Sequence, residues 1–314
     1  MSMLGNSSTL QPEARVFLGD VKHFLNHVDN HTFKLIITSP PYNLGKQYEK
    51  KTDLATYLAW QEEIISLLIP KLTEDGSIVW QTGNYVNNGE IIPLDICFYP
   101  LFTKFGLKLR NRVIWHFEHG LHCSKRFSGR YETALWFTKT DNYTFNLDPV
   151  RIPSKYPGKL HFRGPKKGQP SGNPLGKNPS DYWIFPMLQE EFESGIIDIP
   201  NVKCNHPEKT IHPCQFPVEL IERFILACTN ENDYVFDPFG GVGSTLIAAI
   251  QHKRNAMMCE INNEYVEIAK DRLEQFKTGR LKIRKIGKPI YQPTGNEKVS
   301  KIPESWKQSQ GRLV

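Results

Sequence analysis

The sequence lacks the long apolar runs and the cysteine pairs that would assign it to a membrane or a disulfide-rich class. None of its apolar runs approaches the roughly 18–20 residues that a membrane-spanning helix needs, which excludes a transmembrane protein. The N-terminal residues are polar and lack the basic-then-apolar order of a secretory signal. The six cysteines include no C-x-x-C pair, so neither a disulfide framework nor a zinc ribbon is expected. We therefore expect a cytoplasmic protein.

Histidine and cysteine are also too irregularly spaced to indicate a metal site. They gather in two groups, Cys204, His206, His212 and Cys214, and His116, His119, His122 and Cys123. The first group has the spacing C-x-H-x5-H-x-C, which is unlike the usual structural zinc sites. The second group is more simply a polar cluster at the end of a strand. We expect no metal ion.

Core-forming side chains, in contrast, are plentiful. Apolar residues make up 39% of the 314 residues and aromatic residues 11%, which excludes a wholly disordered chain. Strands are predicted at residues 15–18, 34–38, 77–80, 107–117, 131–137, 234–236 and 255–259, and helices from Asp20 and at 53–68, 94–105, 218–228, 244–252 and 262–276. This alternation predicts an α/β fold whose sheet is mostly parallel, with Trp80, Trp115 and Trp136 in its core.

Positive charge is concentrated in two segments of a chain whose formal net charge is +6. Residues 151–180 hold seven basic side chains and no acidic one, and residues 279–314 hold nine basic and two acidic side chains. Each segment therefore carries +7, which leaves the rest of the chain at −8. In the tail, residues 281–286 alternate like an edge strand and the final residues look disordered, so a frayed end and a DNA-binding arm both stay open.

The first basic segment, residues 151–180, also contains six prolines and five glycines, which exclude a helix or a central strand. It is predicted to be a long loop, and such loops are usually functional or disordered. Tyr156, His161 and Phe162 lie between its charges. Besides a solvated insertion, the pattern indicates a nucleic-acid contact surface, with cations for phosphates and rings for stacking. The predicted DNA contacts are Lys155, Lys159, Arg163, Lys166, Lys167 and Lys177.

A glycine-rich turn, Asp237-Pro238-Phe239-Gly240-Gly241-Val242-Gly243-Ser244-Thr245, follows a predicted strand and opens a helix. Glycines let the backbone approach a ligand closely, and a helix N-terminus offers N–H groups to an anion. Glu260 ends the next predicted strand, where a carboxylate can accept both ribose hydroxyls of an adenosine-containing cofactor. Leu246 stands where a third glycine would complete G-x-G-x-x-G, which disfavours a nicotinamide dinucleotide. The alternative is a tight turn beside an ordinary surface glutamate.

A second turn, Thr38-Ser39-Pro40-Pro41-Tyr42-Asn43, also follows a predicted buried strand. Two prolines fix their own φ angles and bias the preceding residue toward extended geometry, so the turn is stiff. A stiff turn can aim carbonyl oxygens and a hydroxyl at one small group, and Tyr42 adds a flat face for stacking on a planar ring. The alternative is a proline-rich turn that merely ends a strand.

At these residues the sequence resembles the DNA amino-methyltransferases, which use S-adenosylmethionine to methylate the exocyclic nitrogen of cytosine (N4) or adenine (N6). Their catalytic tetrapeptide, Asp/Asn/Ser-Pro-Pro-Tyr/Phe, matches residues 39–42, and their Phe-x-Gly-x-Gly cofactor signature matches residues 239–243. The catalytic motif comes first, which resembles the circularly permuted β class. Residues 130–139 resemble the strand that closes the catalytic half, and residues 209–217 the segment that leads into the cofactor half. The resemblance covers roughly residues 17–276.

The resemblance implies the S-adenosylmethionine-dependent methyltransferase fold, a Rossmann-like α/β fold, here circularly permuted, with a mostly parallel sheet, helices on both faces and a basic target-recognition insertion. It divides the chain into a flexible N-terminus (1–14), the catalytic half (15–143), a target-recognition region (144–208), the cofactor-binding half (209–278) and a basic tail (279–314). The implied catalytic residues are Ser39, Pro40, Pro41 and Tyr42. The implied cofactor-binding residues are Thr38, His212, Asp237, Phe239, Gly241, Gly243 and Glu260.

The function that the resemblance implies is site-specific methylation of double-stranded DNA at a flipped base. Serine at the first motif position favours cytosine N4 over adenine N6. Ser39 and the Pro40 carbonyl accept hydrogen bonds from the amine in this scheme, while Tyr42 stacks on the base. Expected partners are double-stranded DNA and a cognate restriction endonuclease system, with no membrane, and the chain is a monomer or a homodimer. The alternatives are an RNA or protein-glutamine methyltransferase, which the motif order disfavours, and an idle DNA-binding partner, which the intact motifs disfavour.

Overall fold

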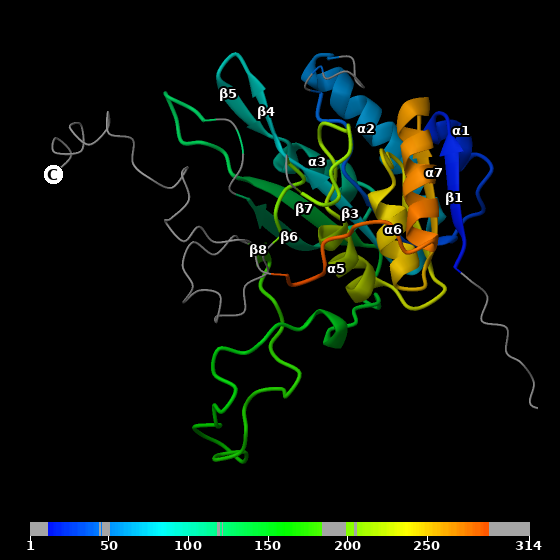
Figure 1. Cartoon of the computed structure of the whole chain (residues 1–314). Coiled ribbons are helices and arrows are strands. Elements are labelled where there is room, and N and C mark those ends of the chain that lie inside the picture. Colours follow the sequence, from blue (N-terminus) through cyan, green and yellow to red (C-terminus); the bar gives the residue numbers. More distant parts are fainter. Residues whose placement is uncertain are drawn as a thin grey trace, which may run out of the picture.

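Eight strands form one sheet in the order β1-β10-β9-β2-β3-β7-β6-β8 (Figure 1). They are β1 Ala14–Leu18, β2 Phe33–Thr38, β3 Leu72–Thr82, β6 Lys108–His116, β7 Tyr131–Thr138, β8 Tyr182–Trp183, β9 Tyr234–Asp237 and β10 Asn255–Glu260. Neighbouring strands are parallel except that β7 is antiparallel to β3 and to β6. The structure, a computed structural model, describes residues 12–43, 45, 51–117, 120, 122–183, 199–203 and 206–288. The predicted mostly parallel sheet is confirmed.

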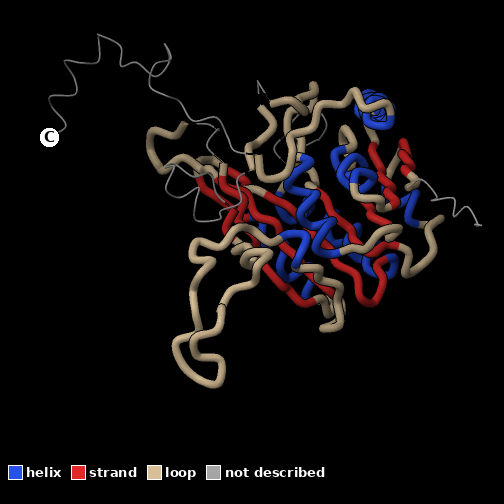
Figure 2. Tube along the Cα trace, turned by 60° about the horizontal axis from the view of Figure 1, so that its bottom comes forward, coloured by secondary structure: helices blue, strands red, loops and turns tan. Residues whose placement is uncertain are grey.

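Helices cover both faces of this sheet (Figure 2). They are α1 Val21–Leu25, α2 Leu54–Leu68, α3 Leu94–Thr103, α5 Val218–Cys228, α6 Ser244–Gln251 and α7 Asn263–Lys277, with short 3-10 helices η1 Ile69–Lys71 and η2 Asp148–Val150. Successive strand residues point to opposite faces, so Ile36 and Ile37 belong to different cores. Ile37 shares its core with α5, α6 and α7, and Ile36 shares its core with α1, α2 and α3. The sheet is therefore buried on both sides, as parallel sheets usually are.

Polar side chains cap the helices at positions that the sequence indicates. The Asp20 carboxylate accepts a hydrogen bond from the Lys22 backbone N–H at 2.7 Å, and the Asn262 side chain accepts one from the Glu264 N–H at 2.9 Å. These bonds satisfy N–H groups that the first turn of a helix leaves unpaired. The predicted helix start at Asp20 is confirmed.

Two distant parts of the chain meet where β2 lies beside β9. Leu35 pairs with Val235 and Ile36 with Phe236 in a parallel ladder. The carboxyl ends of both strands therefore reach the same edge of the sheet, which we call the cavity edge. In open parallel sheets, the loops that follow such neighbouring strands diverge and leave a crevice for a ligand.

The basic segment of residues 151–180 is a long loop, as predicted. A single bridge between Ile152 and Lys177 closes its neck. The chain leading into the loop is tied near the end of α5, where the Asn146 backbone N–H donates to the Ala227 carbonyl at 2.7 Å. This is the edge of the sheet opposite to the cavity edge, and the loop projects away from the sheet there (Figures 1 and 2).

Residues 281–286 do not form the edge strand that their alternation predicts. The buried Arg284 guanidinium forms an ion pair with the Glu219 carboxylate of α5, and the Arg284 backbone N–H donates to the Glu208 carboxylate at 3.0 Å. The segment is thus held against a helix by buried charges and does not join the sheet. The remainder of the predicted tail, residues 289–314, lies outside the described residues.

A two-stranded hairpin, β4 Asn84–Asn87 and β5 Glu90–Pro93, is absent from the sequence-based prediction. Its turn, Asn88-Gly89, has φ angles of 47° and 87°, and positive φ at both central residues is typical of a type I′ turn. The Asn-Gly dipeptide is therefore the signal that could have revealed the hairpin. Its strands are short and largely exposed, so they show no clear apolar alternation.

Candidate active site

The two turns singled out in the sequence border a single cavity of about 480 Å³. Residues 39–43, after β2, form one wall, and residues 237–242, after β9, form another. Further lining comes from residues 19–21, from α2, and from residues 212–216 before α5. The volume lies within the ~300–1,000 Å³ of small-molecule sites. The predicted meeting of the two turns at one cavity is confirmed.

Glycines allow the turn after β9 a backbone conformation that other residues rarely adopt. A Cβ on Gly240 would lie 2.7 Å from the Met258 Cβ, so no side chain fits between the turn and β10. Gly241 and Gly243 have φ angles of 49° and 77°, which L-residues with side chains rarely adopt. Gly241 lines the cavity, whereas Gly243 caps α6 from behind the cavity wall. Gly240 is a required position that the Phe-x-Gly-x-Gly signature does not include.

Glu260 ends β10 and lines the cavity next to this turn. Its Oε2 accepts a hydrogen bond from the Gly241 N–H at 2.9 Å, and its Oε1 accepts one from the Asn262 N–H at 2.8 Å. Each oxygen keeps further acceptor capacity, so the carboxylate can still accept the paired hydroxyls of a ribose. Burial raises the pKa of Glu260. The acceptor set and the space beside Gly241 fit an adenosine-containing cofactor.

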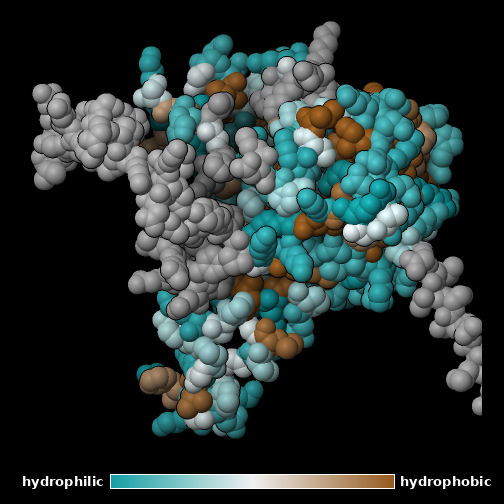
Figure 3. Space-filling view, viewed as in Figure 1, coloured by the Kyte–Doolittle hydropathy of each residue, from teal (hydrophilic) through white to brown (hydrophobic). Residues whose placement is uncertain are grey.

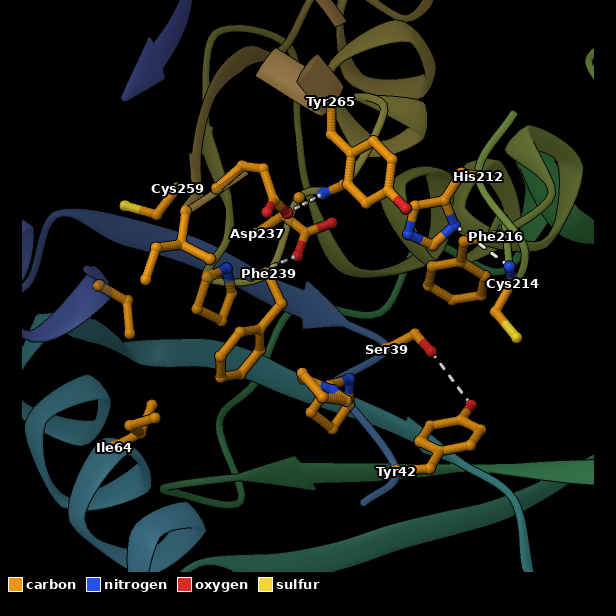
Figure 4. A pocket seen from close by; sticks show the side chains of 18 of the residues that line it. Ser39, Tyr42, Ile64, His212, Cys214, Phe216, Asp237, Phe239, Cys259 and Tyr265 are labelled. Carbon is orange, nitrogen blue, oxygen red and sulfur yellow. Dashed lines mark hydrogen bonds between the residues drawn. The ribbon is translucent and has the colours of Figure 1, made fainter. Parts of the chain in front are cut away.

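His212 and Tyr265 lie together above the glycine turn (Figure 4). Their ring centroids are 4.6 Å apart and the rings meet edge to face. The Cys214 backbone N–H donates to His212 Nδ1 at 3.2 Å, which makes Nε2 the protonated nitrogen of the neutral ring. A Cβ on Gly241 would lie 3.5 Å from this Nε2. His212 therefore presents an N–H donor to whatever group lies against Gly241.

Asp237 organises the glycine turn from inside the protein. Its carboxylate accepts hydrogen bonds from the Thr38 hydroxyl at 2.6 Å, the Thr245 hydroxyl at 2.5 Å and the Phe239 backbone N–H at 3.1 Å. Thr38 and Asp237 are 199 positions apart in the chain, so this contact joins the two turns directly. Thr38 is fully buried and lies behind the cavity lining. Burial outweighs the three hydrogen bonds and raises the pKa of Asp237 to about 6.

The raised pKa of Asp237 predicts a pH dependence of folding stability. Because the folded-state pKa lies above the ordinary value of 3.8, this carboxyl contributes stability that is present at low pH and is lost as pH rises through about 6. Relative to Asp237→Asn, the wild type should gain about 1 kcal/mol of unfolding free energy between pH 7.5 and pH 5. Urea unfolding of both proteins at the two pH values measures this. An unchanged difference would show that the carboxyl titrates normally.

Aromatic side chains form an apolar part of the cavity lining. The Phe239 ring centroid lies 5.6 Å from that of Trp60 and 6.2 Å from that of Trp80. Trp80, Trp115 and Trp136 are buried in the core, as predicted. Trp60, in contrast, lines the cavity from α2 and is absent from the predicted site. Its position three residues after Tyr57, on the same helix face, was the only signal, and it is the ordinary spacing of a core residue.

The corner at residues 39–42 is braced from the α2 side. The Tyr57 hydroxyl donates to the Pro41 carbonyl at 2.6 Å. Asn43, at a φ of 60°, accepts from the Thr52 backbone N–H and donates to the Thr52 carbonyl, both at 2.8 Å. The predicted catalytic residues Ser39, Pro40, Pro41 and Tyr42 all line the cavity. The Ser39 hydroxyl points toward the Tyr42 hydroxyl (Figure 4).

A chain of hydrogen bonds, which we call the relay, runs from Ser39 through Tyr42 and Gln81 to Glu132. The Tyr42 hydroxyl donates to Gln81 Oε1 at 2.6 Å, the Gln81 Nε2 donates to the Glu132 carboxylate, and Ser39 Oγ lies 3.0 Å from the Tyr42 hydroxyl. Because a carboxylate only accepts, Gln81 must turn its NH₂ toward Glu132 and its oxygen toward Tyr42. Tyr42 then gives its one proton to Gln81, so Ser39 is the donor in the last bond. The Ser39 lone pairs are thereby left to accept hydrogen bonds in the cavity.

The relay requires that Tyr42 keep its proton. Burial, and then the charge of the nearby Glu132, raise the pKa of Tyr42 well above its ordinary value. The hydroxyl is therefore a permanent donor at any pH at which the protein works. Gln81 and Glu132 were not among the predicted site residues, because they lie on β3 and β7, far in sequence from the Ser39 corner.

The predicted DNA-contact residues lie far from this corner in the fold. Lys155, Lys159, Arg163, Lys166, Lys167 and Lys177 are all exposed, and they belong to the loop that projects from the opposite edge of the sheet. None of the six lines the cavity. The surface in Figure 3 is mostly hydrophilic, and this projecting loop carries a few apolar side chains among its polar ones. Their role in DNA binding stays a prediction.

Neither a cluster of metal ligands nor a membrane-spanning helix is found in the described part of the chain. Among its residues, no three or more His, Cys, Asp or Glu side chains gather as metal ligands would. Cys204 and His119, members of the two groups noted in the sequence, lie outside the described residues. Burial lowers the pKa of His206 to about 4. Within the same described residues, no helix has the length and apolar character needed to cross a membrane.

A doubly covered, mostly parallel sheet with a glycine turn and an acidic residue at its switch point is typical of Rossmann-like folds, among them that of the S-adenosylmethionine-dependent methyltransferases. Solved structures of this fold resemble the chain at 19–23% identity. The PvuII DNA methyltransferase, described as cytosine-N4-specific, has a TM-score of 0.63 over 86% of this chain and 95% of that one, at 20% identity. A putative DNA modification methylase from Thermus thermophilus, complexed with S-adenosyl-L-methionine, has a TM-score of 0.57 over 84% and 94%, at 22% identity.

The family follows from the sequence comparisons. The family model of N6/N4 methyltransferases, described as DNA methylase, matches residues 33–271. The chain is 46% identical over 256 residues to the type II methyltransferase M.BglII of Bacillus subtilis, which covers 81% of this chain and 67% of that protein. It is 36% identical over 264 residues to M.ScaI of Streptomyces caespitosus, covering 82% and 81%. The chain belongs to the N6/N4 DNA methylase family and is an S-adenosylmethionine-dependent DNA amino-methyltransferase.

Proposed function

We propose that this protein methylates N4 of cytosine at a specific site in double-stranded DNA. The observation that carries the base assignment is Ser39, whose neutral hydroxyl lines the cavity with its lone pairs left as acceptors by the relay. The first motif position is where cytosine-N4 enzymes tend to carry serine and adenine-N6 enzymes aspartate. Adenine N6 is the second candidate, because a relative at 29% identity is named the DNA adenine methyltransferase YhdJ of Escherichia coli.

The cofactor end of the cavity suits S-adenosylmethionine, whose sulfonium supplies an electrophilic methyl group when it is bound. In the proposed arrangement, Glu260 accepts the ribose hydroxyls, and Gly241 allows close backbone approach. His212 Nε2 donates a hydrogen bond beside Gly241, and the rings of Phe239 and Trp60 hold the apolar parts. Thr38 and Gly243 act from behind this surface, and Asp237, which also lines the cavity, fixes the shape of the turn through its hydrogen bonds.

The amine end of the cavity is proposed to overcome the weak nucleophilicity of an exocyclic nitrogen. The nitrogen lone pair is delocalised into the base ring and must be turned toward the electrophile. Acceptors placed around its two N–H groups draw the nitrogen toward tetrahedral geometry and stabilise the positive charge that develops. Ser39 Oγ and the Pro40 carbonyl are proposed as these acceptors, while Tyr42 offers a face for the base. A base in a duplex must first be flipped out of the stack.

The base assignment predicts one modified nucleoside. After plasmid DNA has been incubated with the enzyme and S-adenosylmethionine, digestion to nucleosides and mass spectrometry should reveal N4-methylcytosine. The retention time separates it from 5-methylcytosine, and DNA incubated with the Ser39→Ala variant serves as the control. Finding N6-methyladenine in its place would overturn the cytosine assignment and keep the amino-methyltransferase assignment.

We also propose double-stranded DNA as the substrate and a restriction-modification system as the setting. Support comes from relatives that are named type II methyltransferases. The six cysteines without a disulfide framework favour a cytoplasmic location. The catalytically idle alternative is disfavoured by the intact corner and relay around Ser39 and Tyr42.

A further inference from the structure

A short basic segment, residues 122–130, lies at the cavity edge of the sheet. It leads into β7, whose first residue, Tyr131, pairs with the last residue of β6, His116. At the same edge Thr133 pairs with Thr82 and Glu132 belongs to the relay. The segment therefore begins next to Glu132 of the relay, and it projects from the sheet on the side away from α6 and α7 (Figure 1).

Phe127, at the tip of this segment, exposes 99% of its side chain. Two contacts shape the turn that presents it: the Cys123 backbone N–H donates to the Ser128 hydroxyl at 3.1 Å, and the Arg126 guanidinium donates to the Cys123 sulfur at 3.0 Å. The flanking residues Lys125 and Arg126 are exposed, and residues 122–130 contain no acidic side chain. An aromatic ring held fully in water next to two cations has no role in the core of this protein.

These features match what a distorted duplex needs from a protein. Apolar side chains that insert between base steps stabilise an unstacked duplex, and flanking Lys and Arg residues neutralise the phosphates. A flipped base leaves a gap in the stack that a planar ring can fill. The tip of residues 122–130 combines a ring and two exposed cations, on a segment that leaves the cavity edge of the sheet next to Glu132.

We propose that residues 125–127 form the DNA-distorting contact of this enzyme, with Phe127 occupying the gap left by the flipped base and Lys125 and Arg126 binding the adjacent phosphates. The proposal rests on the proposed function, because it takes the flipped base of double-stranded DNA as the occupant of the cavity. The proposal also separates two roles. Residues 125–127 act at the target base, whereas the predicted DNA contacts of residues 151–180 lie away from that base.

The chain offers a matched control for Phe127. Phe162 is also an exposed phenylalanine, at 87%, in a basic setting between His161 and Arg163. It belongs to the projecting loop, which leaves the sheet after β7 at the edge where Thr138 pairs with Ser77, opposite to the cavity. Truncating either ring removes the same exposed group, but only Phe127 belongs to the segment at the cavity edge of the sheet.

The test compares Phe127→Ala, Phe127→Trp and Phe162→Ala on two duplexes. The methylated site is first mapped by sequencing plasmid DNA treated with the wild type, and duplexes are made with the target base either paired or mismatched. On the paired duplex, kcat/KM of Phe127→Ala should fall roughly tenfold, the usual scale of one lost stacking contact. On the mismatched duplex, where flipping is easier, it should return to within about twofold of the wild type. Phe127→Trp should stay near the wild type on both.

The outcomes separate this proposal from the proposed function. Phe162→Ala should give the same ratio between the two duplexes as the wild type. Equal losses of Phe127→Ala on both duplexes, no loss on the paired duplex, or a Phe127→Trp variant as impaired as Phe127→Ala would each overturn the role of Phe127. In all three results the wild type still methylates DNA. Failure of the proposed function itself would appear as a wild type that transfers no methyl group to any duplex.

Discussion

Replacing Ser39 with alanine is expected to lower kcat at least ~100-fold, on the scale of losing one polar group that stabilises developing charge in an active site. Ser39 Oγ is the acceptor that the relay keeps available in the cavity, and alanine leaves nothing in its place. The affinity for S-adenosylmethionine should stay within about twofold, because the Ser39 hydroxyl forms its hydrogen bond with Tyr42 and is not among the groups proposed to hold the cofactor. Steady-state transfer of a tritiated methyl group measures kcat, and calorimetry measures cofactor binding.

Tyr42 variants separate stacking from hydrogen bonding in the same experiment. Tyr42→Ala removes both the ring and the relay and should lose activity as fully as Ser39→Ala. Tyr42→Phe keeps the ring but frees the Ser39 proton from its acceptor, so an intermediate loss of ~10-fold is expected. Full activity in both Ser39→Ala and Tyr42→Ala would remove the catalytic assignment of this corner.

Glu132→Gln should lower kcat by roughly 10-fold to 100-fold with little change in the KM for DNA. Glu132 acts as a positioning residue, because its carboxylate obliges Gln81 to accept from Tyr42. A glutamine at position 132 can donate as well as accept, so the Gln81 amide is free to reverse. Tyr42 would then donate to Ser39. The Ser39 hydroxyl would point its own proton at the amine and could no longer accept a hydrogen bond from it as well.

Glu132→Asp is the control, because it keeps an acceptor-only group on the same strand. Glu132→Asp should recover more than about half of the kcat that is lost in Glu132→Gln. The melting temperatures of both variants should be similar, since both keep a polar group at the same half-buried position near the start of β7. If Glu132→Asp and Glu132→Gln lose activity equally, or if kcat falls in step with melting temperature, Glu132 serves the fold and the relay has no catalytic role.

The two turns of the active site could be predicted because their signals are local. Each turn is specified by a few neighbouring residues. In one these are two successive prolines after a buried apolar run, and in the other they are glycines between a strand and a helix. The strands around them were predicted for the same reason, since β2 and β9 are short buried runs with sharp ends. Adjacency of the two turns followed from the resemblance and is confirmed by the hydrogen bond between Thr38 and Asp237.

The remaining features depend on contacts between distant segments. Gln81 and Glu132 belong to the relay only because β7 lies antiparallel to β3, and no local pattern specifies that pairing. The prediction of an edge strand at residues 281–286 was wrong because the buried ion pair of Arg284 with Glu219 outweighs the weak tendency to form a strand that the alternating sequence gives. Composition likewise predicted the basic loop of residues 151–180 but not the edge of the sheet from which it projects.

Because β2 pairs with β9, the active site of a newly synthesised chain can form only after both strands have been made. The corner at Ser39 leaves the ribosome early, whereas Glu260 and the glycine turn follow some two hundred residues later, a delay of ~10–40 s at bacterial synthesis rates. Through that interval β2 lacks its neighbour β9 and the growing polypeptide has no complete pocket. A nascent copy therefore cannot modify the genome until its synthesis is nearly finished.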